Sequence, residues 1–326
     1  MSCDVLAYLI SPQMEHTMTL HKSSGGLKWL PEDRHCPVCA SSKRKTLGRR
    51  GGNAHYQSKG VETSIVQCLT CDLVYAYPTL VPQSNPYELE TAQQYFGLHD
   101  FDEKVLKGEA LADFAAAALG RTGEMLELGC GRGEFLIGAG KKGWKVKGVE
   151  MTGDYAQDAR SHGIEVESSP IQECEALGQM YDVILLIAVL EHVYDPLGTL
   201  RQINKALRPG GLLFVDVPNE FSLAMSLGNL YMKLQGRDWV VNLSPTFPPY
   251  HVVGFSALSL RNTLLRAGLQ IHTMYRPKRN EILPKGDTIR RRVELLSLRC
   301  VTHIGRLIGM GDGIECWAIK PKADNA

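Results

Sequence analysis

From Met125 onward, short apolar runs alternate with helix-like segments, and this alternation constrains the fold of the 326-residue chain more than any other feature. Apolar strands that alternate with helices are typical of a parallel sheet covered on both faces. The predicted strands are residues 125–129, 145–150, 164–168, 181–189, 211–218, 269–277 and 313–321. We therefore expect an α/β fold with a Rossmann-like, doubly wound, mostly parallel sheet, whose ligands lie beyond the carboxyl ends of its strands.

Helices are predicted between these strands because apolar residues recur there at helical spacing. Their ranges are 101–120, 134–142, 196–208 and 256–268. The first is rich in alanine and stops at Gly120, since glycine favours the position just after a helix. This helix introduces the α/β part of the chain.

A glycine turn, ELGCGRGEF, follows the first of these strands. Gly129, Gly131 and Gly133 permit close approach of a ligand to the backbone, and the following helix offers free N–H donors. A dinucleotide-binding turn needs GxGxxG, and here the third glycine is one residue out of register. Glu127 would repel a pyrophosphate, whereas its charge suits the ammonium and sulfonium groups of S-adenosylmethionine.

A second acid follows the second strand. Glu150 lies 21 residues after Gly129 (150 − 129), where a carboxylate can accept hydrogen bonds from both hydroxyls of a ribose. Together, the two acids and the glycine turn predict one adenosyl-binding site.

The segments ELGCGRGEF, GVE and YDVILLIAVLEHVYDPLGTLRQINKALRPGGLLFVDVPN resemble the class I S-adenosylmethionine-dependent methyltransferases over roughly residues 100–320. The resemblance implies a class I methyltransferase fold and a set of cofactor contacts. These contacts are Glu127, Gly129, Cys130, Gly131 and Gly133 for the methionine part, Glu150 and Met151 for the ribose, Pro170 and Ile171 for the adenine, and Ala188 and Leu190 beside the sulfonium.

Two CxxC pairs precede the α/β part, one formed by Cys36 and Cys39 and the other by Cys68 and Cys71. Four thiolates at this spacing can surround a tetrahedral Zn²⁺, and a structural site of this kind leaves no position for catalytic water. A redox dithiol and unligated core cysteines are the alternatives. The doubled motif, without a thioredoxin-like setting, favours zinc.

The surroundings of these cysteines carry a second resemblance. CPVC followed by IVQCLTCDLVYAYP is similar to the small N-terminal zinc ribbon of bacterial methyltransferases that act on sugars and cell-surface glycans. Those proteins usually have glycine where this chain has Asp72. The two resemblances predict three parts: an N-terminal segment (1–31), a zinc-ribbon module (32–82), and a methyltransferase domain (83–326) with an acceptor-side insertion at 220–250.

A hydroxyl or carbon acid that accepts a methyl group needs a base. The segment GRDWVVNLSPTFPPYHVVGFSALSL resembles a part of the same glycan-linked enzymes and places Tyr250 and His251 before a helix. His192 follows the fourth strand. We predict His251 as base or acceptor ligand, with Tyr250 beside it and His192 as the second candidate; the alternative for each histidine is a purely structural hydrogen-bonding role.

These features predict an enzyme that methylates a small molecule or glycan, such as a nucleotide-linked sugar or polysaccharide precursor. An RNA methyltransferase is the first alternative, although a net charge of +1 argues against nucleic acid as partner. A non-catalytic binding or assembly protein is the second. No apolar run reaches the roughly 20 residues of a membrane span, and the first residues lack the pattern of a secretion signal, so we expect a cytoplasmic protein. The pattern predicts no particular oligomeric state.

Overall fold

The computed structural model describes residues 27–86, 100–275 and 289–322. The chain divides into two compact units. Of the described residues, the cysteine unit comprises 27–86, 218–259 and 289–314, and the sheet unit comprises 100–217, 260–275 and 315–322. This division groups the predicted insertion at 220–250 with the cysteine-rich module. The first 26 residues of the predicted N-terminal segment lie outside the described residues.

The sheet unit is built on seven strands in the order β12-β13-β10-β9-β6-β7-β8. Their bounds are β6 Glu124–Leu128, β7 Lys145–Val149, β8 Glu165–Glu167, β9 Tyr181–Ile187, β10 Leu207–Pro218, β12 Gln270–Tyr275 and β13 Gly313–Ile319. The pairs β6–β7, β7–β8, β6–β9 and β9–β10 are parallel, and β12–β13 is antiparallel. The predicted α/β fold with a mostly parallel sheet is therefore confirmed.

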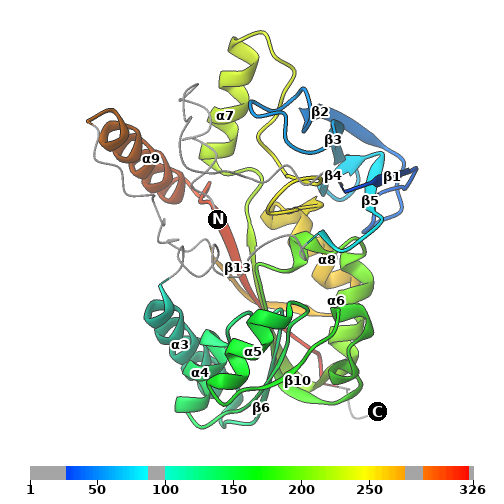
Figure 1. Cartoon of the computed structure of the whole chain (residues 1–326). Helices are drawn as coiled ribbons and strands as arrows, with labels where there is room; N and C mark the ends of the chain where they lie inside the picture. Colours follow the sequence, from blue (N-terminus) through cyan, green and yellow to red (C-terminus); the bar gives the residue numbers. More distant parts are fainter. Residues whose placement is uncertain (1–26, 87–99, 276–288, 323–326) are drawn as a thin grey trace. The chain divides into compact units, whose positions relative to one another are not determined.

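Helices connect these strands, and their ends follow the local sequence. They are α3 Phe101–Leu119, α4 Glu134–Lys141, α5 Gly153–Ser161, α6 Pro196–Ala206 and α8 Ala257–Arg266. The side chain of Asp100 caps α3 by accepting a hydrogen bond from the backbone N–H of Glu103, and Gly120 ends α3 with a φ of 72°. In Figure 1, α3, α4 and α5 lie on one side of the sheet and α6 lies on the other.

Helices α3 and α4 touch through their glycines. A Cβ atom built on Gly138 of α4 would lie 2.2 Å from the carbonyl oxygen of Val105, and one built on Gly108 of α3 would lie 2.4 Å from that of Phe135. No other residue type leaves room for backbones this close. The two glycines thus fix how α3 packs beside the helix that follows the glycine turn.

The core of the sheet unit lies between the strands and α3 and α4. Trp317 is fully buried and stacks on Phe114 at a ring distance of 4.8 Å, and the tilted ring of Phe214 lies 4.9 Å from it. Burial of apolar side chains of this size is the main favourable term in folding.

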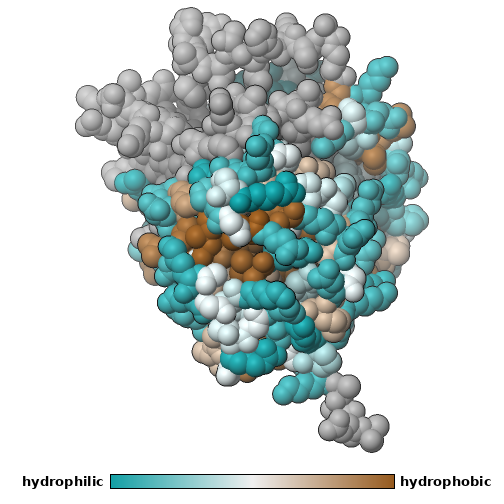
Figure 2. Space-filling view, turned by 60° about the horizontal axis from the view of Figure 1, so that its bottom comes forward, coloured by the Kyte–Doolittle hydropathy of each residue, from teal (hydrophilic) through white to brown (hydrophobic). Residues whose placement is uncertain are grey.

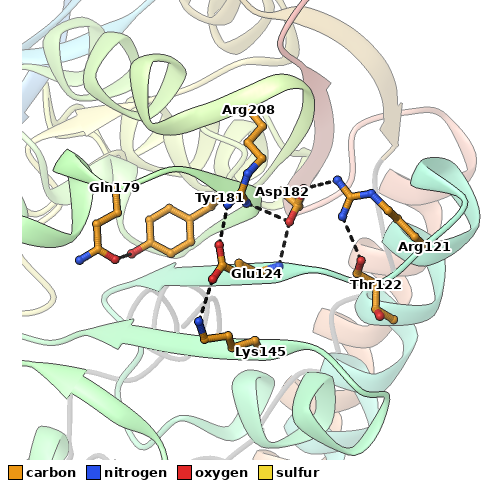
Figure 3. Close-up of polar contacts among 8 residues, drawn as sticks. All are labelled: Arg121, Thr122, Glu124, Lys145, Gln179, Tyr181, Asp182 and Arg208. Atoms are coloured by element: carbon orange, nitrogen blue, oxygen red, sulfur yellow. Dashed lines mark hydrogen bonds and ion pairs between the residues drawn. The ribbon is translucent and has the colours of Figure 1, made fainter.

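Charged side chains gather at the amino ends of β6, β7 and β9, as Figure 3 shows. We call Arg121, Glu124, Lys145, Asp182 and Arg208 the amino-end cluster. The carboxylate of Asp182, only 3% exposed, accepts hydrogen bonds from Arg121 at 2.6 Å, from Arg208 at 3.0 Å and from the backbone N–H of Glu124 at 2.9 Å. The cluster joins four neighbouring strands, because Arg208 comes from the start of β10, at the end of the sheet opposite the glycine turn.

Within the described residues, the cysteine unit contains two small sheets and the helices α7 and α9. Strand β1 Trp29–Glu32 pairs with β5 Thr79–Pro82, and the strands β2 Arg44–Arg50, β3 Thr63–Cys68, β4 Val74–Tyr77 and β11 Val253–Gly254 form a sheet in the order β11-β4-β3-β2. The pairs β11–β4, β4–β3 and β3–β2 are antiparallel. The helices are α7 Leu223–Leu234 and α9 Ile289–Leu307. Val240 and Leu243 from the predicted insertion pack with Ile65, Val74 and Ala76 in one apolar cluster.

Hydrophilic side chains predominate on the face drawn in Figure 2, and the largest hydrophobic patch lies near the centre of the view. Of the helices within the described ranges, none combines the length and the apolar character that crossing a bilayer requires.

Candidate functional site

The glycine turn joins β6 to α4 and adopts a backbone that favours glycine. Gly129, Gly131 and Gly133 have φ angles of 70°, 55° and 78°. A Cβ on Gly129 would lie 2.6 Å from Val189 Cγ2, whereas one on Gly131 would meet no atom within 4 Å. Gly129 therefore allows close packing, and Gly131 faces open space that a ligand can use.

The end of β7 holds the turn in place. The backbone N–H groups of Gly129 and Cys130 both donate to the carbonyl of Val149, at 2.8 and 3.0 Å. Directly after this strand, the carboxylate of Glu150 accepts hydrogen bonds from the backbone N–H of Gly131 at 2.9 Å and of Thr152 at 2.8 Å. The two predicted features, the turn and the second acid, are thus brought together.

Glu127 lies under the turn as a buried acid. The residue is 2% exposed, and within the described part of the chain its Oε2 atom has no hydrogen-bond partner. Burial, followed by the nearby charge of Glu134, raises the pKa of the Glu127 carboxyl well above its ordinary value, while Lys104 opposes this shift. Keeping a buried acid without a partner costs stability, so this group suits a cationic ligand.

The other predicted cofactor residues follow the carboxyl ends of neighbouring strands. Leu128 of β6 is in register with Val149 of β7 and with Leu186 of β9, so these three strands end at one edge. Met151 comes after β7 and is 38% exposed. Pro170 and Ile171 are half-buried at the start of a 3-10 turn after β8.

Two further predicted residues come after β9. Ala188 has a φ of 52°, which is uncommon for a residue with a side chain, and its N–H donates to the Asp216 carbonyl at 2.8 Å. Leu190 is fully buried at the start of the 3-10 turn Leu190–His192. Non-glycine residues in this conformation cluster at ligand sites, and the role of Ala188 beside the sulfonium stays a prediction.

The predicted acceptor-side residues lie in both units. His192 is half-buried in the sheet unit, where its backbone N–H donates to the carbonyl of Val189 at 2.9 Å. Tyr250 and His251 belong to the cysteine unit and are 7% and 8% exposed. Tyr250 also has a positive φ, 61°, and the His251 N–H donates to Ser244 Oγ at 3.3 Å.

The four predicted metal ligands come together. The Sγ atoms of Cys36 and Cys71 are 3.4 Å apart, as are those of Cys39 and Cys68, and all four lie within 4.8 Å of one another. Contact with Cys71 lowers the pKa of Cys36 to about 5 against the opposing effect of burial, and burial raises that of Cys39 to about 11. A tetrahedron of thiolates around Zn²⁺ requires sulfur separations of about 3.8 Å, within the observed spread.

One buried acid was missed by the sequence analysis. Glu220, just beyond β10, is 3% exposed and accepts a hydrogen bond from Asn242 Nδ2 at 2.8 Å. Burial raises its pKa to about 7, against the lowering effects of Asn242 and Leu243. A single glutamate after a strand has no sequence signal that separates it from a surface acid.

Comparisons with known proteins match most of the α/β part. A family model described as a methyltransferase domain matches residues 101–274. The ubiquinone biosynthesis O-methyltransferase of Aliivibrio fischeri (strain MJ11) is 34% identical over 129 residues, which cover 37% of this chain and 53% of that protein. The corresponding enzyme of Xanthomonas oryzae pv. oryzae (strain PXO99A) is 27% identical over 181 residues, covering 52% of this chain and 73% of that protein.

The chain thus spans about half the length of the Aliivibrio protein. Among solved structures, a SAM dependent methyltransferase from Archaeoglobus fulgidus has a TM-score of 0.47 and 20% identity, and the match covers 69% of this chain and 99% of that one. Because the family model matches more than half of the 326 residues, the chain belongs to the methyltransferase domain family.

Proposed function

We propose that this chain binds S-adenosylmethionine at the glycine turn and transfers its methyl group to a small-molecule acceptor. The observation that carries the proposal is Glu127, a buried carboxyl whose Oε2 has no partner within the described residues. An acid in this state favours a ligand with a positive charge, and it opposes a pyrophosphate.

The remaining residues of the turn suit the other parts of the cofactor. Gly131 faces open space, and Glu150 is held beside it by two backbone N–H groups. In the proposal, Glu150 and Met151 hold the ribose, and Pro170 and Ile171 contact the adenine. When bound, S-adenosylmethionine supplies an activated methyl group. Ala188 and Leu190, after β9, would border the reacting centre.

The acceptor in this proposal is a small molecule with a hydroxyl group. Support comes from the relatives, which are named as O-methyltransferases of ubiquinone biosynthesis. The cysteine module and the segment around His251 resemble glycan-linked enzymes and add nucleotide-linked sugars to the candidates. His251 would take up the hydroxyl proton with Tyr250 beside it, and His192 is the second candidate for this role.

We also propose that Cys36, Cys39, Cys68 and Cys71 hold a structural Zn²⁺. The proposal is supported by their mutual Sγ distances of less than 4.8 Å. Four thiolates would close every coordination position, so the ion would stabilise the cysteine unit and take no part in methyl transfer.

Calorimetric titration of the metal-analysed protein with S-adenosylmethionine, and separately with NADH, tests the cofactor. We expect micromolar affinity, about −8 kcal/mol, for the former alone. Glu150→Ala and Gly131→Arg should lose this affinity. Gly143→Arg is the matched control because Gly143 also has a positive φ, 83°, and no atom within 4 Å of a built Cβ, but it follows α4 and is remote in sequence from the turn.

Binding of NADH alone would contradict the proposal and indicate that the glycine turn is a dinucleotide-binding site. Normal S-adenosylmethionine affinity in both turn variants would contradict the assigned pocket. With binding established, a methyl-transfer screen of catechols and nucleotide sugars separates the two acceptor classes, and absence of turnover on every acceptor would favour a binding protein.

A further inference from the structure

The loop at 240–256 carries Tyr250 and His251. Along its length it contacts the predicted zinc-ribbon module, residues 32–82, which we also call the cysteine-rich module. At its start, the Val240 N–H donates to the Arg49 carbonyl at 3.1 Å. Further along, Arg50 Nε donates to the Leu243 carbonyl at 3.2 Å. Every partner in these contacts belongs to β2, so the loop begins on the module's own sheet.

Later contacts continue along the same module. Thr246 Oγ1 accepts a hydrogen bond from the Val61 N–H and donates one to the Val61 carbonyl, both at 2.9 Å. After His251, strand β11 pairs with β4, with Val253 opposite Tyr75. The loop therefore begins beside β2, at one edge of this sheet, and ends as β11, the strand at the opposite edge.

The last contact is made by Asp72, the residue that follows the second cysteine pair. Ser256 Oγ donates to Asp72 Oδ2 at 2.6 Å, and Gln67 Nε2 donates to the other carboxylate oxygen. Ser256 also caps α8, because its Oγ accepts from the Ser259 N–H at 3.0 Å while Ser259 Oγ accepts from the Ser256 N–H at 2.8 Å. Asp72 thus accepts a hydrogen bond from Ser256, the residue that ends the loop and caps α8.

The cysteines in turn fix Asp72. Its N–H donates to the Cys68 carbonyl at 3.1 Å, and it follows Cys71 directly. Its φ of 69° is a conformation that favours glycine, so the aspartate is kept at some cost in backbone energy. The side-chain contact with Ser256 supplies a physical reason for an aspartate at this position.

We propose that Asp72 is a positioning residue that couples the metal-binding cysteine pair to the loop bearing Tyr250 and His251. The proposal rests on the proposed function for the roles of those two residues and of the metal. Its consequence is that loss of the metal or of the Asp72 carboxylate loosens the acceptor-side loop, while the glycine turn in the sheet unit keeps its cofactor affinity.

Hydrogen exchange followed by mass spectrometry tests this coupling without an acceptor. In Asp72→Gly, whose backbone conformation suits glycine, we expect at least tenfold faster exchange across 250–256 with full zinc content. Asp72→Asn retains an oxygen acceptor for Ser256 and should restore slow exchange. Thr70→Ala is the matched control, since Thr70 lies in the same turn and its hydroxyl donates to Ser41 Oγ at 2.9 Å rather than to the loop.

Removal of zinc by a chelator should give the same acceleration in the wild-type chain, and added Zn²⁺ should reverse it. Unchanged exchange at 250–256 in Asp72→Gly, or equally fast exchange in Asp72→Asn, would overturn the role of the carboxylate. Purified protein without zinc, or unchanged exchange after chelation, would overturn the role of the metal. Titration with S-adenosylmethionine on the same samples reports separately on the proposed function, because exchange does not depend on cofactor binding.

Discussion

Replacing Asp182 by asparagine should destabilise the sheet unit measurably, because the substitution removes the charge at the centre of the amino-end cluster (Figure 3). The carboxylate is buried and accepts three hydrogen bonds. An asparagine amide group of the same shape would have to turn its NH₂ toward at least one of those donors. Hydrogen bonds to charged groups contribute about 1.5–3 kcal/mol each when buried.

That figure must be reduced here, since the side chains of Arg121 and Arg208 are 58% and 37% exposed. Exposed ion pairs contribute at most about 1 kcal/mol each. We therefore expect a loss of about 2 kcal/mol, which lowers the melting temperature by roughly 4–8 °C in a domain of this size. Thermal unfolding followed by circular dichroism at pH 7 measures the difference.

The same variant gives a pH signature. Burial raises the pKa of Asp182, but hydrogen bonds from Arg121 and Glu124 and the charge of Arg208 outweigh it, so the folded pKa lies below the ordinary value. The stabilisation is then complete above the unfolded pKa of about 3.9 and is lost as the pH falls through the folded pKa. The gap between wild type and variant should shrink below about pH 4.

Lys145→Met serves as the control, because Lys145 belongs to the same cluster yet is 81% exposed and forms its ion pair with Glu124 at 2.9 Å. Solvent screens an exposed pair of this kind, so its loss should leave the melting temperature almost unchanged. The reasoning is refuted if Asp182→Asn melts within 1 °C of wild type, or if the gap is independent of pH.

Three further predictions concern other buried contacts. Gly138→Ala should destabilise the protein by about 2–4 kcal/mol in chemical denaturation, because its Cβ would lie 2.2 Å from the Val105 carbonyl oxygen. Gly140→Ala on the same helix should be neutral or stabilising, since a Cβ there meets no atom within 4 Å; equal effects of the two substitutions would contradict this. Lys107 Nζ lies 3.2 and 2.7 Å from the buried carboxylates of Asp216 and Glu315. Lys107→Met removes this cation and should lower the free energy of unfolding by about 2–4 kcal/mol in the same assay. Lys142→Met, at a surface ion pair, should have almost no effect. Glu220 has a folded pKa of about 7, above the unfolded value, so the stability of the wild type should fall as the pH rises from 5 to 8. Glu220→Gln lacks this titration and should gain up to about 3 kcal/mol relative to wild type over that interval. Parallel pH profiles of the two proteins would contradict this.

The parallel sheet could be predicted from sequence because its determinants are local. Each apolar run from Met125 onward lies within a few residues of the turn that ends it, and strands and helices formed close to the predicted bounds. The glycine turn was equally readable, since its three glycines are nearly contiguous. The cysteine cluster followed from spacing alone, although its two halves are separated by 28 residues between Cys39 and Cys68 (68 − 39 − 1).

The assignment of 220–250 could not be predicted in this way. Its grouping with the cysteine unit depends on contacts such as Arg49 with Asp238, at 2.7 Å, which join residues 189 positions apart. Neither Arg49 nor Asp238 lies in a sequence pattern that predicts the other as its partner. The contact between Asp72 and Ser256 was hidden for the same reason, and only the unexpected aspartate after Cys71 marked the position.

The buried acid Glu127 has a consequence for protons. Burial raises the pKa of this carboxyl well above its ordinary value, so the free protein holds the proton to a higher pH than an ordinary glutamate does. A ligand ammonium placed against it would favour the ionised form, so cofactor binding should expel that proton. The measured binding enthalpy would then vary with the ionisation enthalpy of the buffer, and the slope would give the number of protons released per site. Affinity would also increase as the pH is raised toward the pKa of the free protein's carboxyl, so the site would bind its cofactor by exchanging one positive charge for another.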